Sequence, residues 1–286
     1  MRVGDYETAW ALAGETLAKR DPVTRDDPAL PYHLRWVWDG TPVDGREVLV
    51  RCYHGLGDTI QFARFLPLLA RRAAAVRVEV QPRLVSLLTG LAGEVQFVPF
   101  DVARPLPPSA CDVEITELPF ALRATPEQVT APYLLAKPAA LPPGTVGLCY
   151  SAGDWDPARC MPPALFAPLC QTSCVSLVAE PASFEALNPE GCPFDMDATV
   201  ALVAGCALVI TVDTMIAHLA GALGRPTWLL LKHDPDWRWD PARSNTPWYP
   251  TMRVYAQPSP GDWPSVIAEV AADLARNPLV NKDFRA

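Results

Sequence analysis

From residue 47 onward, the chain alternates between short apolar runs rich in β-branched residues and stretches whose apolar residues recur at helical spacing. The first part of the chain contains the runs 47–53 (EVLVRCY), 76–81 (VRVEVQ), 95–100 (VQFVPF) and 112–116 (DVEIT). Helices are predicted to start near Asp58 and Pro82, between the first three runs. Strands and helices that alternate in this way are typical of a parallel sheet, so this part predicts a small parallel-sheet domain.

The same alternation restarts after a proline-rich linker at 139–145 (AALPPGT). Further strands are predicted at 145–151, 174–180, 207–212 and 227–232, and helices at 163–170, 197–205 and 214–223. A last helix is predicted at 262–276, where Asp262 is a suitable N-cap and Pro264 lies in the first turn. This part of the chain therefore predicts a second parallel-sheet domain.

The pattern as a whole predicts an α/β chain with two Rossmann-like domains, at 46–140 and 141–286, after a helical extension and connection at 1–45. Residues 1–20 predict a short amphipathic helix within that extension. Ligands of open parallel sheets bind at the carboxyl ends of the strands. Two such domains in tandem therefore predict a ligand cleft between them, and binding motifs are expected directly after strands.

Composition narrows the function classes. With 286 residues, of which 50% are hydrophobic and 20% charged, the chain can bury a sizeable core. Its net charge of -8 disfavours nucleic acid and anionic membrane surfaces as partners. No apolar run is long enough to span a membrane and the first twenty residues are charged throughout, so a cytoplasmic location is expected. The eight cysteines form no CxxC pair, which gives a zinc site little support.

The motif HGLGDTIQ follows the first predicted strand and combines Gly55, Gly57 and Asp58, flanked by the polar His54 and Gln61. The two glycines permit a tight turn and a close approach of backbone to a ligand. The motif fails as a dinucleotide fingerprint, because that pattern requires a small residue at position 60 and this chain has isoleucine there.

The Asp58 carboxylate has two open interpretations. Aspartate is among the best N-cap residues, and capping alone would explain an aspartate at this position without any catalytic role. A carboxylate at the mouth of a cleft can instead act as a general base, although a helix N-terminus lowers its basicity.

A second junction of strand and helix lies at 210–226 (ITVDTMIAHLAGALGRP), with Asp213, Thr214 and Met215 at the predicted helix start. Free N–H groups at a helix N-terminus bind phosphate well. His218 is four residues after Thr214 and shares its helix face, so both side chains could approach one ligand. In the alternative interpretation Asp213 or Thr214 is only a cap, and His218 is a hydrogen-bonded, half-buried histidine.

The stretch 232–250 (KHDPDWRWDPARSNTPWYP) places Lys232 directly after a strand and interleaves arginines with Trp237 and Trp239. Cations beside aromatic faces suit a base, a sugar or a diphosphate. The alternative is a proline-rich loop held by buried tryptophans. Asp234 and Asp236 could hold a divalent metal, but Asp-x-Asp pairs recur elsewhere in the chain, so no metal is assigned.

The loop after the first strand of the second predicted domain is 150–160 (YSAGDWDPARC). It offers Ser151 and Arg159 to a phosphate, and Arg159 is its one cation, opposite Asp154 and Asp156.

These motifs, in this order, resemble glycosyltransferase family 9, the heptosyltransferase-like enzymes with two Rossmann-like domains called GT-B, and among them a bacterial branch associated with tetratricopeptide repeats. The resemblance runs from about residue 45 to 273. Its most specific segments are GLGDTIQFARFLPLLA, EVQPRL, VITVDTMIAHLAGALGRPTWLLL, DWRW, TPWYP and GDW.

The resemblance implies an inverting hexosyl or heptosyl transfer from a nucleotide-diphospho-sugar to a hydroxyl of a glycan, a lipid-linked glycan or a protein. It implies that Asp58 is the general base on the acceptor side, and that Asp213 and Thr214 belong to the donor site in the second domain. No cofactor is implied. Helix N-termini and cations can stabilise the leaving diphosphate, so transfer without a metal is expected.

Two departures from the family pattern keep other functions open. Relatives often have Glu-Gln where this chain has Tyr53 and His54, and their loop corresponding to 151–160 is richer in basic residues. One alternative is a nucleotide-sugar or glycan-binding protein that has lost turnover and acts in a glycan-assembly complex through its N-terminal helix. Another is metal-dependent transfer through Asp234 and Asp236.

Overall fold

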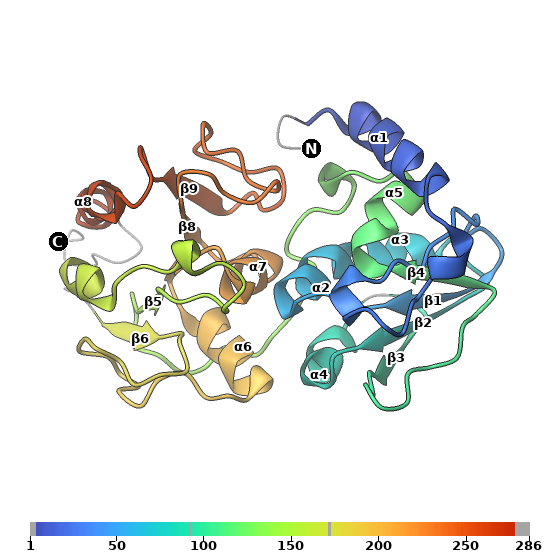
Figure 1. Cartoon of the computed structure of the whole chain (residues 1–286). Helices are drawn as coiled ribbons and strands as arrows, with labels where there is room; N and C mark the ends of the chain where they lie inside the picture. Colours follow the sequence, from blue (N-terminus) through green and yellow to red (C-terminus); the bar gives the residue numbers. More distant parts are fainter. Residues whose placement is uncertain (1–3, 92, 171–172, 278–286) are drawn as a thin grey trace. The chain divides into compact units, whose positions relative to one another are not determined.

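The computed structural model describes residues 4–91, 93–170 and 173–277, which form two compact units. One unit runs up to Val129 and the other starts at Thr130. Each unit is built on its own parallel sheet (Figure 1). The GT-B fold class predicted from the sequence is confirmed.

The sheet of the first unit has four parallel strands in the order β3-β2-β1-β4. Their bounds are Glu47–Arg51 (β1), Ala75–Val80 (β2), Val95–Pro99 (β3) and Cys111–Glu114 (β4). The α-helices of this unit are Tyr6–Ala18 (α1), Leu56–Phe62 (α2), Leu66–Ala70 (α3), Val85–Leu88 (α4) and Leu118–Leu122 (α5). The first three predicted strands and their helices therefore lie within a few residues of their predicted places.

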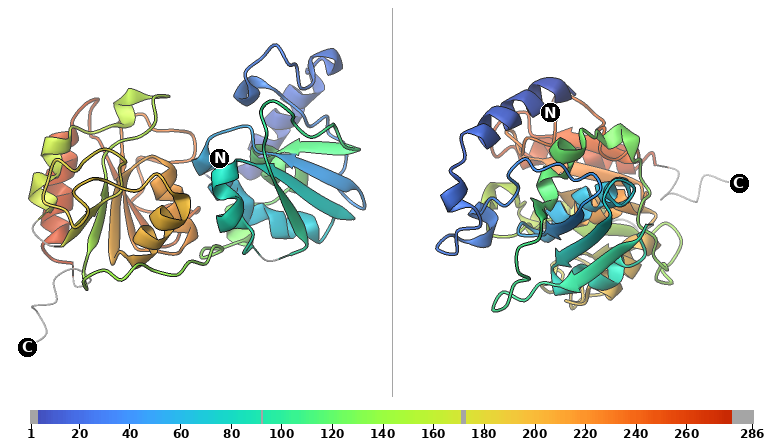
Figure 2. Two further views of the ribbon diagram at one scale, coloured as in Figure 1. Left: turned by 90° about the horizontal axis from the view of Figure 1, so that it is seen from below. Right: turned by 90° about the vertical axis from the view of Figure 1, so that its right-hand side faces the viewer.

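The two faces of the first sheet differ in polarity. Valines at alternating positions, such as Val48 and Val76, are buried on one face, to which α3 and α4 contribute contacts. The opposite face carries Arg51 and the other charged residues of the strands. The connection between β3 and β4, residues 100–110, contains no helix (Figures 1 and 2). A loop therefore runs where a crossover helix would otherwise be expected.

The N-terminal extension belongs to the first unit. Helix α1 lies over α5 (Figure 1), where the guanidinium of Arg123 is 5.5 Å from the centroid of the buried Trp10 ring. Farther along, Arg20 forms an ion pair of 2.8 Å with Glu117. Residues 1–45 were predicted as a helical extension and connection, and the described part of that segment belongs to the first unit.

The sheet of the second unit has five parallel strands in the order β6-β5-β7-β8-β9. The strands are Val146–Cys149 (β5), Cys174–Ser176 (β6), Leu208–Val212 (β7), Thr227–Leu231 (β8) and Met252–Ala256 (β9). The α-helices are Met196–Gly205 (α6), Met215–Ala222 (α7) and Trp263–Leu274 (α8). Asp262 caps α8 as predicted, by accepting a hydrogen bond from the Ser265 N–H.

Two elements of the second unit differ from the sequence prediction. The helix predicted at 163–170 is a 3-10 helix, Pro163–Leu169, with Pro168 inside it. A proline lacks the N–H that an α-helix needs at that point. Strand β9 was not predicted. Most of the other strands were recognised because they alternate with helices, whereas β8 and β9 are joined by a loop that contains no helix.

Residues 130–139, which precede and enter the predicted linker, pack with the second unit. The N–H groups of Tyr133 and Leu134 donate to the carbonyl of Ala222, and the Ala139 N–H donates to the carbonyl of Ala201. The division between the units therefore falls at 129/130, whereas the sequence placed it at 140/141. Within the described residues, no helix is long and apolar enough to cross a membrane.

Candidate functional site

The HGLGD loop connects β1 to α2 at the carboxyl edge of the first sheet. Helix α2 begins at Leu56, and its N-cap is Gly55 in an extended conformation. Asp58 is thus the third residue of the helix, and its Oδ2 accepts the Gly55 N–H at 3.0 Å. The carboxylate is half-buried. The interpretation of Asp58 as the N-cap itself is wrong by three positions, but the side chain does stabilise the start of the helix.

Gln81, the first residue after β2, fixes the same loop. Its Nε2 donates to the carbonyl of His54 at 2.8 Å and to that of Cys52 at 3.1 Å. Its Oε1 accepts the hydroxyl of Thr59 on α2 at 3.0 Å. One amide thus ties the loop and the helix to the neighbouring strand. Gln81 was not predicted as a site residue, although it lies in the segment EVQPRL.

Gln81→Leu should loosen this loop. The substitution removes the partners of two main-chain carbonyls, which we expect to cost about 1–3 kcal/mol of unfolding free energy. Amide hydrogen exchange of residues 52–58 should speed up more than that of the β2 amides. Gln96→Leu, an exposed glutamine on β3 of the same sheet, is the matched control. Equal exchange in the two variants would show that Gln81 does not hold the loop.

The other predicted residues of this loop have different environments. The Nδ1 of His54 lies 2.9 Å from Oε1 of Glu114, a carboxylate that is 3% exposed at the end of β4. Gly55 is exposed and Gly57 is half-buried. Gln61, which was predicted as a cleft residue, has no exposed surface.

A buried cluster of charged residues lies at the end of β1, directly before this loop. Arg51 is 1% exposed and donates to Oε2 of Glu79 at 2.6 Å and to Oδ2 of Asp112 at 2.9 Å. The second oxygens of these carboxylates accept the N–H groups of Leu106 and Ser109. The cluster therefore fixes the helix-free connection between β3 and β4 to the sheet.

The second predicted junction is the end of β7 and the start of α7. Thr214 is the N-cap and makes no side-chain capping hydrogen bond, and Met215 is the first residue of the helix. Arg159 reaches this junction from the loop after β5, with its Nη1 donating to the main-chain oxygen of Asp213 at 3.1 Å. The structure thus brings together Arg159, Asp213 and Thr214, three of the residues that the sequence analysis offered to a phosphate.

Asp213 is buried, and burial raises the pKa of its carboxyl above the ordinary value of 3.8. Trp239 and Arg159 oppose the shift by favouring the charged form. A neutral carboxyl at this position is therefore easier to accommodate in the folded chain than a charged one.

This shift has a consequence for stability. Because the folded chain binds the Asp213 proton more tightly than the unfolded chain, this group lowers stability as the pH rises above about 3.9. Asp213→Asn should therefore raise the unfolding free energy at pH 7, and the gain should shrink as the pH falls towards 4. Thermal unfolding across this range measures it. A gain independent of pH would mean that the ionisation of Asp213 is not its cause.

His218 and Trp239 are part of the core. His218 is buried, its Nδ1 lies 3.0 Å from the hydroxyl of Tyr249, and its ring stacks on Trp239 at 5.6 Å. Trp239 and Tyr249 have no exposed surface. His218 is thus hydrogen-bonded, as in the alternative interpretation, but it is buried rather than half-buried. Trp239 has no exposed face to stack on a ligand. Gly221 makes this packing possible, because a Cβ there would meet the Tyr249 ring at 2.4 Å.

The remaining predicted residues surround the junction. Trp237 is 39% exposed, with the Arg238 guanidinium 4.7 Å from its ring centroid. Ser151 is half-buried after β5. Lys232, directly after β8, forms an ion pair of 2.7 Å with Asp156. Lys232 therefore shares the carboxyl edge of the sheet with the β7–α7 junction, since β7 and β8 are neighbours.

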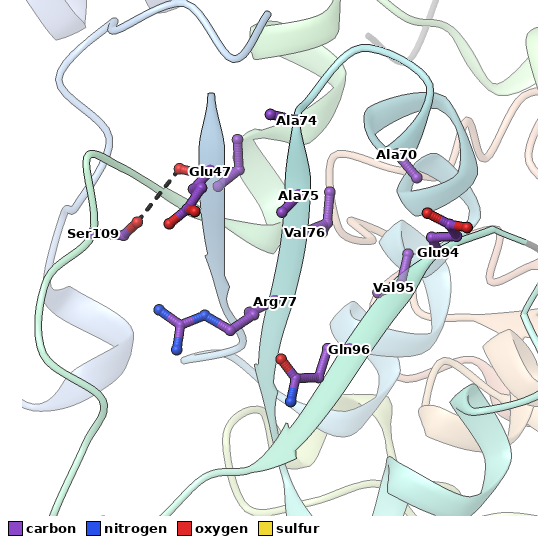
Figure 3. A pocket seen from close by; sticks show the side chains of 11 residues that line it. Glu47, Ala70, Ala74, Ala75, Val76, Arg77, Glu94, Val95, Gln96 and Ser109 are labelled. Atoms are coloured by element: carbon purple, nitrogen blue, oxygen red, sulfur yellow. Dashed lines mark hydrogen bonds between the residues drawn. The ribbon is translucent and has the colours of Figure 1, made fainter. Parts of the chain in front are cut away.

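Two further features of the described residues lie away from this junction. No group of three or more histidine, cysteine, aspartate or glutamate side chains could hold a metal ion among the residues that the structure describes. A hollow of about 600 Å³ on the first sheet is lined by Glu47, Arg77, Gln96 and Ser109 among others (Figure 3). It lies where β1 and β2 begin, at the opposite edge from Asp58, and so it is not the predicted site.

The segment around the second junction is similar to a known protein family. Residues 191–247 match the model of glycosyltransferase family 9 (heptosyltransferase). This segment contains the predicted residues Asp213, Thr214, His218 and Lys232.

One curated relative is Protein FlbA of Caulobacter vibrioides, 30% identical over 128 residues. The aligned part is 42% of this chain and 21% of FlbA, so the chain spans about a fifth of that relative.

Solved structures with the same fold cover most of the chain. E. coli heptosyltransferase WaaC with ADP-2-deoxy-2-fluoro heptose matches 81% of this chain and 100% of its own, at 13% identity and a TM-score of 0.55. E. coli ADP-heptose lps heptosyltransferase II matches 80% and 99%, at 17% identity and a TM-score of 0.51. The iron-containing dodecameric glycosyltransferase TibC of enterotoxigenic E. coli matches 82% and 77%, at 13% identity and a TM-score of 0.54. The chain therefore has the fold of these glycosyltransferases, and its second unit contains a segment similar to glycosyltransferase family 9.

Proposed function

We propose that the chain is an inverting glycosyltransferase that moves a sugar from a nucleotide-diphospho-sugar to a hydroxyl acceptor. The observation that carries this proposal is the β7–α7 junction, where Arg159 contacts the residue before the Thr214 N-cap. This junction lies inside the segment that matches family 9.

The donor diphosphate binds at this junction. The first N–H groups of α7 have no partner within the helix and are available to an anion at the N-cap, and Arg159 and Lys232 supply positive charge at the same edge of the sheet. As the bond between the sugar and the diphosphate breaks, negative charge grows on the leaving phosphate, and these groups stabilise it. No step requires a metal ion, so we expect transfer to continue in the presence of a chelator.

Asp58 is the general base. Its carboxylate takes the proton of the acceptor hydroxyl as the oxygen attacks the anomeric carbon from the side opposite the leaving diphosphate, which inverts that carbon. Its hydrogen bond from the Gly55 N–H and the Gln81 contacts keep the loop in one conformation.

ADP-heptose is the donor to test first, because similar solved structures are described as ADP-heptose enzymes or contain an analogue of that donor. The sugar is a heptose or a hexose, and the acceptor is a glycan, a lipid-linked glycan or a protein. We also propose a cytoplasmic location, and α1 as a surface for a protein partner.

A nucleotide and donor panel tests the proposal. ADP, GDP, UDP, CMP and dTDP compounds are compared by thermal shift, because a ligand present at 100 times its Kd stabilises the native state by about 2.7 kcal/mol. Release of nucleoside diphosphate from the matching sugar donor, with acceptor present, measures turnover. A chain that responds to none of these nucleotides would contradict the proposal.

The second candidate function is a nucleotide-sugar-binding protein without turnover. The ion pair between Lys232 and Asp156 favours it, because that pair leaves less positive charge for a leaving diphosphate. This candidate predicts a thermal shift with a nucleotide but no release of nucleoside diphosphate from any donor.

A further inference from the structure

A carboxylate in the loop after β5 forms an ion pair with a cation of the proposed donor site. The Nζ of Lys232 lies 2.7 Å from Oδ2 of Asp156, and both side chains are about a quarter exposed, at 26% and 27%. The other carboxylate oxygen of Asp156 accepts the Ala158 N–H at 3.1 Å and starts a short 3-10 helix, Pro157–Arg159. Asp156 thus links the ion pair to the segment that carries Arg159.

The ion pair lies at the edge where the donor is proposed to bind. Strands β5, β7 and β8 are adjacent in the sheet, so the residues that follow them meet at one edge. Those residues include Asp156 and Arg159 after β5, the Thr214 N-cap after β7, and Lys232 after β8. A diphosphate at this edge competes with the Asp156 carboxylate for Lys232, because both are oxygen anions that seek the same ammonium group.

We propose that Asp156 is an internal counter-anion that the donor diphosphate displaces from Lys232, and that it thereby sets the affinity for nucleoside diphosphates. The inference rests on the proposed function and adds to it a residue that weakens binding. A nucleoside diphosphate carries more negative charge than one carboxylate, so it displaces Asp156 from Lys232. Because the ion pair must first be broken, the affinity of the chain for the nucleoside diphosphate is lower than it would be if Lys232 had no carboxylate partner.

Asp156→Asn tests this role without removing the cap, since the asparagine oxygen can still accept the Ala158 N–H. We expect ADP to bind about two- to five-fold more tightly, the range that follows from measured energies of partly exposed ion pairs. The gain should shrink in about 0.5 M salt, which screens such charges. Isothermal titration calorimetry of the full chain with ADP, or with the nucleotide that gives the largest thermal shift, measures both effects.

Two further variants separate this role from a general change in charge. Asp154→Asn makes the same charge change two residues away at an exposed position, and it should alter the affinity less than Asp156→Asn. Lys232→Met should weaken binding, and in the double variant Asp156→Asn/Lys232→Met the gain from Asp156→Asn should disappear.

Contrary results are distinct for each level of the proposal. The role of Asp156 is overturned if Asp156→Asn leaves the affinity for ADP unchanged or weakens it. It is also overturned if Asp154→Asn gives the same gain in affinity, or if the gain persists in the double variant with Lys232→Met. None of these results would contradict the proposed glycosyltransferase function. If the wild-type chain binds none of the panel nucleotides, the proposed function fails, and this inference fails with it.

Discussion

Asp58→Asn is expected to lower the rate of sugar transfer by at least about 100-fold, the usual contribution of a general base, while the affinity for the donor nucleotide stays within two-fold. The amide has almost the same shape as the carboxylate and its oxygen can still accept the Gly55 N–H. It cannot take a proton from a hydroxyl at neutral pH. Initial transfer rates and titration with the nucleotide measure the two quantities.

The helix-start role of Asp58 requires its own control. Asp58→Ala removes both the proton acceptor and the hydrogen bond to Gly55, and should cost about 1 kcal/mol of stability more than Asp58→Asn. If Asp58 is the base, the two variants lose transfer to a similar extent despite their different stabilities. If transfer instead follows stability, and Asp58→Asn remains fully active, Asp58 only holds the helix start.

Arg51→Met is expected to destabilise the first unit by about 3–5 kcal/mol, the usual effect of breaking a buried ion pair from one side. The guanidinium is 1% exposed and holds Glu79 and Asp112, which are 1% and 3% exposed. Its loss leaves two carboxylates buried without their cation. Hydrogen exchange of the β1 and β2 amides measures the effect, because two compact units need not unfold in one step.

Arg77→Met is the matched control for this prediction, since Arg77 is an exposed arginine on β2 of the same sheet. We expect it to change stability by less than about 0.5 kcal/mol. Neutralising both carboxylates in the Arg51 variant, with Glu79→Gln and Asp112→Asn, should restore part of the loss. A loss below about 1 kcal/mol in Arg51→Met would show that water or relaxation compensates the buried charges.

The sequence placed most strands and α-helices within a few residues, because buried parallel strands are continuous apolar runs and helices carry caps. Asp262 caps α8 as predicted, and Gly224, with φ of +66°, follows the end of α7. Strand β9 was missed, although Met252 and Val254 alternate with the exposed Arg253 in the pattern of a half-buried strand.

The candidate site was predictable in its location but not in its contacts. Glycines, an aspartate or a threonine directly after an apolar run mark the carboxyl edge of a strand, and the family segment 191–247 adds its own motif. Gln81 and Glu114 hold the first loop from neighbouring strands, and no local pattern in the sequence distinguishes them from other polar residues at strand ends.

The sequence by itself determined the two parallel-sheet units, the order of most of their elements and the two strand-to-helix junctions, because these follow from local periodicity and turn chemistry. The tertiary structure alone decided that Trp239 and His218 pack in the core, that Gln81 fixes the Asp58 loop and that Lys232 pairs with Asp156. Each of these contacts joins residues from different elements of the fold. Which of them meet depends on how the strands align in the sheet, and the spacing of residues along the chain does not encode that alignment.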